Sequence, residues 1–303
     1  MNFVKQGRKS AKKTLEKCIA VAQQWASAPE NAEHLHGLRV SLRRLRSHAI
    51  FLESILPDQK NHETSVKMKQ LIHLLGPLRD QYVEKEWIAQ WLHKHRNEPV
   101  HAKNFALLRP MESAPAPKIS VDIVRALQSS NIDHFLEERW TTLEKTSPVQ
   151  YELLLSAQYN RGLLKIQNRI LKLNETDKKT LHSVRVSCKQ LRYFCEEMKF
   201  PKKKSERQRT LDALIKIQTR FGKVQDLVLL KSALQPNFET RPDAEQLTKQ
   251  EKKKANKQEN NKISNNIRQD LDLDLEQQTK KALALVGQKT PLRKHSLHRI
   301  RVA

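Results

Sequence analysis

One basic sequence pattern occurs twice in this chain and limits the architectures that the chain can adopt. It reads HGLRVSLRRLR at 36–46 and HSVRVSCKQLR at 182–192, with six of eleven positions identical and an offset of 146 residues. The same offset brings LLGPLRD at 74–80 onto RFGKVQD at 220–226, so that one glycine and one aspartate match there too. Two matches at one offset predict a duplicated helical unit.

The rest of the sequence is typical of an all-α protein. Only 6 of the 303 residues are glycine, and long stretches rich in Leu, Lys, Gln and Glu contain few alternating apolar runs. Such residues favour helices, whereas strands would place apolar residues at every second position. We expect helices over residues 10–27, 31–56, 62–95, 120–145, 148–172, 176–198 and 205–233, and one within 243–287.

The duplication predicts a single pseudo-symmetric domain over residues 1–303 whose two halves face each other. Half one covers about 1–115 and half two about 116–303. The stretch RPMESAPAPK at 109–118 contains three prolines and predicts a linker, because proline breaks helices. The polar, lysine-rich segment at 248–262 is either a solvated helix or a loop.

The charge of the chain points to a polyanionic partner. It has 57 Lys and Arg against 33 Asp and Glu, a net charge of +24, and a pI near 10.0. Such an excess attracts nucleic acid, anionic membranes or phosphate polymers. The three cysteines have no metal-ligand spacing, and the apolar run near the N-terminus is too short for a signal peptide. We therefore expect a cytoplasmic protein with reduced thiols and no membrane span.

The first basic pattern forms a cationic row beside an apolar stripe when it is drawn as a helix. At about 100° per residue, the cations fall in a sector roughly 80° wide. They are His36, Arg39, Arg43 and Arg46. The neighbouring stripe consists of Leu35, Leu38, Leu42 and Leu45. The second copy repeats the row with His182, Arg185, Lys189 and Arg192.

A row of one charge sign is unusual for a solvated helix face. Such faces normally mix Glu and Lys, because pairs at i,i+4 stabilise a helix and like charges weaken it. An anion that screens the row explains why it persists in both copies. Arginine suits this role because its planar fork donates to two phosphate oxygens at once and remains charged. The alternative is a plain solvated face.

The histidines and the downstream segments leave alternatives open. His36 and His182 either face phosphate, which favours their protonated form, or pack through hydrogen bonds. Asp80 and Asp226 either bind arginines of the first pattern or only end a helical turn. Weaker cationic candidates follow at helical spacing: Lys69, Arg79, Lys216, Arg220 and Lys223.

The paired patterns HxxRVxxRRLR and HxxRVxxKxLRY, each followed by a glycine-containing segment, resemble the CHAD family, the conserved histidine α-helical domain. The resemblance covers roughly residues 10–290. It implies two pseudo-symmetric helical bundles from an internal duplication that face a shared basic cavity. It also implies binding of inorganic polyphosphate and association with polyphosphate granules. The residues that the resemblance assigns to polyphosphate are His36, Arg39, Arg43, Arg44, Arg46, His182, Arg185, Lys189 and Arg192, with Tyr193 at the end of the second copy.

The second copy departs from the first at two positions. Gln190 stands where the first copy has Arg44, and Gln225 stands where it has Arg79, so half two offers fewer cationic contacts. The chain has no glycine-rich phosphate loop, and the acids of DLDLDLE at 270–276 scatter around a helix. We therefore expect a binding protein without catalysis, bound metal or cofactor.

Nucleic acid is the alternative ligand on the same basic surface. Phosphate contacts dominate non-specific affinity for RNA and DNA, so the charge supports both ligands equally. Aromatic residues are only 5% of the chain, and Tyr193 is the one aromatic residue in the basic patterns. Single-strand binders usually stack bases on such rings. The sequence therefore favours polyphosphate, and it leaves the oligomeric state open.

Overall fold

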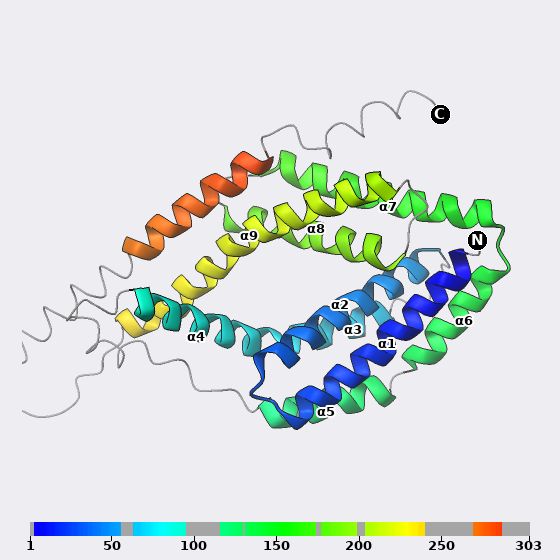
Figure 1. The fold of residues 1–303 in the computed structure, drawn as a ribbon, viewed down its shortest axis with the longest axis horizontal. Coiled ribbons are helices and arrows are strands. Elements are labelled where there is room, and N and C mark those ends of the chain that lie inside the picture. Colours follow the sequence, from blue (N-terminus) through cyan, green and yellow to red (C-terminus); the bar gives the residue numbers. More distant parts are fainter. Residues whose placement is uncertain are drawn as a thin grey trace, which may run out of the picture.

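The computed structural model describes residues 3–55, 63–94, 116–129, 131–173, 177–198, 204–239 and 269–286. All regular structure within these ranges is helical, which confirms the predicted all-α class. In chain order the helices are α1 (Phe3–Ser27), α2 (Ala32–Ile55), α3 (Glu63–Leu74), α4 (Gly76–Lys94), α5 (Ala116–Ser129), α6 (Ile132–Glu144), α7 (Pro148–Leu171), α8 (Lys178–Glu197) and α9 (Lys204–Glu239). A further helix covers residues 269–286 and is drawn in orange in Figure 1.

Capping side chains explain several of these boundaries. The Asn31 side chain accepts hydrogen bonds from the backbone N–H groups of Glu33 (2.9 Å) and His34 (3.2 Å) at the start of α2. Helix α7 begins with a capping box between Ser147 and Gln150. Asp177 accepts from the Lys179 N–H at 2.8 Å before α8. Each cap satisfies donors that the first helical turn leaves without a partner.

Two predicted helices are each two helices in the structure. The predicted helix 62–95 ends at Leu74 and restarts at Gly76, because Pro77 has no N–H and its ring obstructs a continuous helix. Pro77 is instead tolerated in the first turn of α4. The predicted helix 120–145 divides into α5 and α6 around the polar stretch SSN, whose residues favour turns.

The other helices are not divided, and only their boundaries differ from the predicted ones. Helix α1 starts at Phe3, seven residues before the predicted start. The predicted linker 109–118 lies mostly outside the described residues, and residues 116–118 belong to α5. The lysine-rich segment 248–262 also lies outside them. Within the described part of the chain, no helix is long and apolar enough to cross a bilayer.

The helices pack around a central contact between α2 and α8. Helix α2 also packs on α1 and α3, and α8 packs on α7 and α9 (Figure 1). Helices α5 and α6 both pack on α1, while α4 reaches α9. At an offset of 146 residues, α1, α2 and the α3–α4 pair fall on α7, α8 and α9. This order agrees with the predicted duplication, which stays a prediction.

Aromatic rings form the centre of the core. Phe51 on α2 lies 6.1 Å from the rings of Trp140 and Tyr151 and 5.8 Å from Phe194, measured between centroids. Rings at such distances attract each other in addition to the area they bury. The cluster therefore joins α2 to α6, α7 and α8 and holds the two basic patterns in a fixed relation.

Replacing Phe51 by alanine should lower the free energy of unfolding by about 3–5 kcal/mol, because the side chain is fully buried and leaves a cavity. Urea denaturation followed by circular dichroism measures this loss. Leu171→Ala is the control, since Leu171 is 77% exposed and its removal should cost less than about 0.5 kcal/mol. Equal losses in both variants would contradict the central role of the aromatic cluster.

Candidate anion-binding site

The apolar stripes of α2 and α8 bring the two cationic rows together. All four leucines of the first stripe are at most 1% exposed. They are Leu35, Leu38, Leu42 and Leu45. The equivalent residues of α8 are also buried: Leu181, Val184, Cys188 and Leu191. Because α2 and α8 also contact each other, the cations at the edges of the two stripes act on one another.

We refer to Arg39, Arg43, Arg185 and Lys189 as the central cations. Burial, together with repulsion from Arg185 and Arg43, lowers the pKa of Lys189 to about 6. Burial and Arg43 likewise lower the pKa of Arg39 to about 10. Burial is the largest cause of both shifts, and repulsion from neighbouring arginines adds to it, although Asp226 and Asp80 oppose it.

Arg185 is the central cation with a buried hydrogen-bond donor that lacks an acceptor. Its Nε is buried and has no hydrogen-bond partner within the described residues. Its Nη2 lies 3.9 Å from an Asp226 carboxylate oxygen, an ion pair that is too long for a hydrogen bond. The guanidinium lies over Gly222, where a Cβ would come 3.4 Å from Nε. The glycine of this segment therefore leaves room for the arginine.

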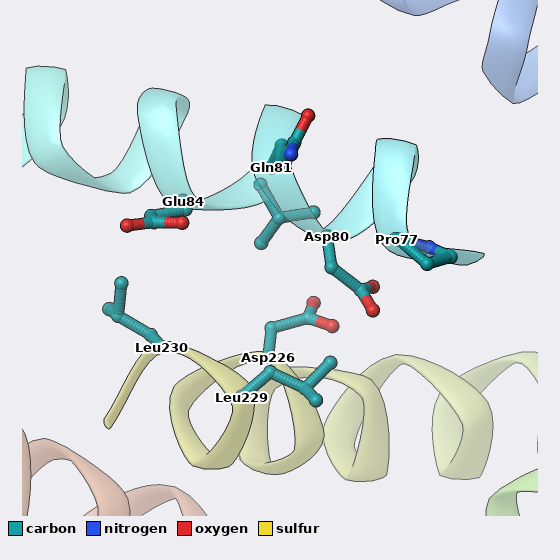
Figure 2. Close-up of a pocket in the computed structure, with 8 residues that line it drawn as sticks. Pro77, Asp80, Gln81, Glu84, Asp226, Leu229 and Leu230 are labelled. Carbon is teal, nitrogen blue, oxygen red and sulfur yellow. The ribbon is translucent and has the colours of Figure 1, made fainter. Parts of the chain in front are cut away.

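The downstream aspartates are close to these cations. Asp226 on α9 pairs with Arg185 of the second pattern, rather than with an arginine of the first. Asp80 on α4 is directed toward Asp226 (Figure 2). Loss of hydration raises the pKa of both aspartates, although arginines oppose the change: Arg39 at Asp80 and Arg185 at Asp226. The two carboxylates therefore compensate the central cations only in part.

The two histidines have different neighbours. His182 Nδ1 lies 3.0 Å from Gln225 Oε1, an acceptor, so Nδ1 carries the hydrogen and donates. At the equivalent place in half one stands Arg79, which together with burial lowers the pKa of His36. Burial also lowers the pKa of His182. Without an anion, both histidines therefore favour the neutral form near neutral pH.

Other predicted site residues have protein partners. Arg44 Nη2 lies 3.1 Å from Glu196 Oε2, and Arg192 Nε donates to Glu196 Oε1 at 2.7 Å. Arg46 Nε donates to the Ser65 carbonyl at 3.0 Å. The structure thus uses Arg44, Arg46 and Arg192 in contacts between and within helices. Among the central cations, Arg39 also makes such a contact, because its Nη1 donates to the Ile72 carbonyl on α3 at 3.2 Å.

The weaker candidates spread over the surface, except for Arg79 and Tyr193. Arg79 acts on His36 and on both aspartates. Tyr193 is only 5% exposed, and the Arg192 guanidinium lies 5.3 Å from its ring centroid. The exposed remainder consists of Lys69, Lys216, Arg220 and Lys223.

Sequence reasoning missed two cations of α7 and a buried acid. Arg169 donates to the Ser183 carbonyl at 2.5 Å, and Lys165 donates to Gln190 Oε1 at 3.2 Å. Glu197 accepts from Thr14 Oγ1 at 2.9 Å and pairs with the fully buried His48 at 3.1 Å. These residues lie outside the repeated cationic rows, so the repeat gave no signal for them. Within the described residues, no three His, Cys, Asp or Glu side chains are arranged to hold a metal ion.

Comparisons with known proteins agree with this architecture. The family model of the CHAD domain matches residues 11–235. The crystal structure of the CHAD domain from the plant Ricinus communis has a TM-score of 0.58 to this chain. The two sequences are 17% identical, and the match covers 96% of this chain and 89% of that chain. At this identity the likeness concerns the fold alone. No curated protein matches the chain.

Replacing Lys189 by methionine should stabilise the chain, and more so at pH 7 than at pH 10. The folded-state pKa is about 6, whereas an unfolded lysine has a pKa of about 10.4. Between these values the unfolded chain binds a proton that the folded chain does not, so stability rises with pH in this window. Methionine has no ionisable group, so it removes this loss of stability at pH 7. Urea denaturation at both pH values, in buffer without phosphate, measures the difference.

Lys216→Met is the matched control, because Lys216 is exposed on α9. It should change the free energy of unfolding by less than about 0.5 kcal/mol at either pH. If Lys189→Met instead destabilises the chain at pH 7, Lys189 has a favourable partner and the picture of a lysine whose burial costs stability is wrong.

Proposed function

Because this chain belongs to the CHAD family, we propose that it binds inorganic polyphosphate through the central cations and catalyses no reaction on it. The observation that carries the proposal is the buried Nε of Arg185, a donor without a partner among cations that repel one another. A buried unsatisfied donor is costly, and a charged one more so. A phosphate oxygen supplies both the acceptor and the missing negative charge.

Binding would change the charge of the site as well as fill it. Arginine forks donate to phosphate oxygens at Arg39 and Arg185, while counterions released from the polymer add a favourable entropy. A phosphate beside Lys189 favours its ammonium form, so binding takes up a proton near neutral pH. Protonation of His36 and His182 on binding would likewise take up protons. Affinity should therefore rise as pH falls.

The ligand needs negative charge at short intervals and nothing else. The central cations come from two helices, α2 and α8, and lie close enough to act on one another. Tyr193 is buried under Arg192 and offers no exposed face for a base. These facts favour a phosphate polymer over nucleic acid. Cytoplasmic association with polyphosphate granules follows from this proposal.

Fluorescence anisotropy of labelled long-chain polyphosphate near physiological salt tests the proposal. Unlabelled polyphosphate, single-stranded RNA and duplex DNA compete separately at equal phosphate concentration. We expect polyphosphate to compete at least about ten times better than either nucleic acid, because the site has no platform for bases. Equal competition by all three would mean a general polyanion binder. Better competition by RNA would replace the proposal with nucleic-acid binding.

Arg39→Ala combined with Arg185→Ala should weaken polyphosphate binding by about 100-fold or more, since a hydrogen bond to a charged group contributes about 1.5–3 kcal/mol. The slope of log affinity against log salt should fall by about 1.4, or about 0.7 for each phosphate that an arginine no longer neutralises. The same anisotropy titration, repeated at several salt concentrations, measures both effects.

Lys12→Ala combined with Lys13→Ala is the matched control, because both lysines are exposed on α1 and the same charge is removed. It should weaken binding only slightly. The lysines within 252–254 offer a second control of equal charge. If either lysine pair proves as damaging as the arginine pair, bulk charge rather than the central cations determines affinity.

A further inference from the structure

A pocket of about 220 Å³ lies between α4 and α9, next to the central cations. Three acids line it: Asp80 and Glu84 from α4 and Asp226 from α9. Figure 2 shows them beside apolar walls that include Pro77, Leu229 and Leu230. We propose that this pocket binds the ammonium end of a small aliphatic amine.

Glu84 gives the strongest reason for a missing partner. The residue is only 5% exposed, and its Oε1 is buried without a hydrogen-bond partner in the described part of the chain. A buried carboxylate oxygen without a donor is costly, because water no longer solvates it. An ammonium group has three donors and a full positive charge, and it satisfies this oxygen better than a neutral ligand does.

Asp80 and Asp226 add negative charge at the same place. Their carboxylates face each other, and Asp226 adds to the rise in the pKa of Asp80 that burial begins. Arg185 approaches Asp226 only to 3.9 Å, so the carboxylate keeps lone pairs for another donor. Arg39 and Arg185 offset part of the repulsion between the two aspartates, and a cation placed between the helices relieves the remainder and pairs with Glu84 as well.

The walls of the pocket favour an organic cation over a metal ion. Leucine and proline side chains accommodate the methylene groups of an alkyl chain, whereas Mg²⁺ keeps several of its waters and needs polar surroundings. The volume is below the roughly 300–1,000 Å³ of pockets for drug-sized ligands, which fits a narrow chain.

Isothermal titration calorimetry of 1,4-diaminobutane into the full chain, at low salt and without phosphate, tests the proposal. We expect one saturable site. Glu84→Gln keeps the size of the side chain but removes its charge, and should weaken binding at least ten-fold. Leu229→Phe reduces the space without changing the charge and should also weaken binding. Glu152→Gln, on the exposed face of α7, is the matched control and should bind as the unchanged chain does.

Three results would overturn the proposal. One is the absence of saturable diamine binding to the unchanged chain. Another is unchanged affinity in a Glu84→Gln chain whose circular dichroism shows it to be folded. The third is displacement of the diamine by an equal concentration of Mg²⁺, which would indicate a metal site. Because polyphosphate is absent from the titration, these results are independent of the proposed polyphosphate binding.

Discussion

The contact between α2 and α8 places like charges beside one another, and the electrostatics of the site follow from it. Burial of Leu38 and Leu42 on one helix and of Val184 on the other stabilises the contact. Each fully buried side chain of this size contributes about 1.5–3 kcal/mol. The cations follow the apolar stripes at helical spacing, so they cannot move apart without exposing the stripes. Packing free energy therefore holds a charge arrangement that electrostatics alone would disfavour.

A buried acid on α8 balances part of this charge on the side facing α1. Burial alone would raise the pKa of Glu197, yet hydrogen bonds from His48 and Thr14 and the charge of Arg44 bring it below its usual value. The carboxylate thus stays ionised where three helices meet. Arg44 belongs to the same basic pattern as Arg39 but serves this interface. Arg44 thus has carboxylate partners at this interface, whereas Arg39 donates to the Ile72 carbonyl and Arg185 Nε has no hydrogen-bond partner among the described residues.

The sequence was sufficient to predict those helix boundaries that are set by residues close by in the chain. Both ends of helix α2 lie within one residue of the predicted limits, and its start is set locally by the Asn31 cap. The break at Leu75 was missed although Gly76 and Pro77 are a local breaker signal, because the apolar spacing continues across it. The cationic rows were predictable from the spacing of the residues. Which arginines bind a protein carboxylate was not predictable, because Arg44 pairs with Glu196, 152 residues away in the sequence.

The two copies of the pattern keep their own cations but differ in what surrounds them. His182 donates to Gln225, whereas Arg79 at the equivalent place adds to the lowering of the pKa of His36 that burial begins. Likewise Gly222 lies under a guanidinium, while a Cβ at Gly76 would meet nothing within 4 Å. The equivalent side chains of α2 and α8 share their helical spacing, whereas their contacts depend on the different residues of the neighbouring helices. The α2 end of the site is consequently more positive than the α8 end, where the hydrogen bond from His182 to Gln225 stands in place of the charge of Arg79. Under the proposed function the two ends would hold a phosphate by different physical means.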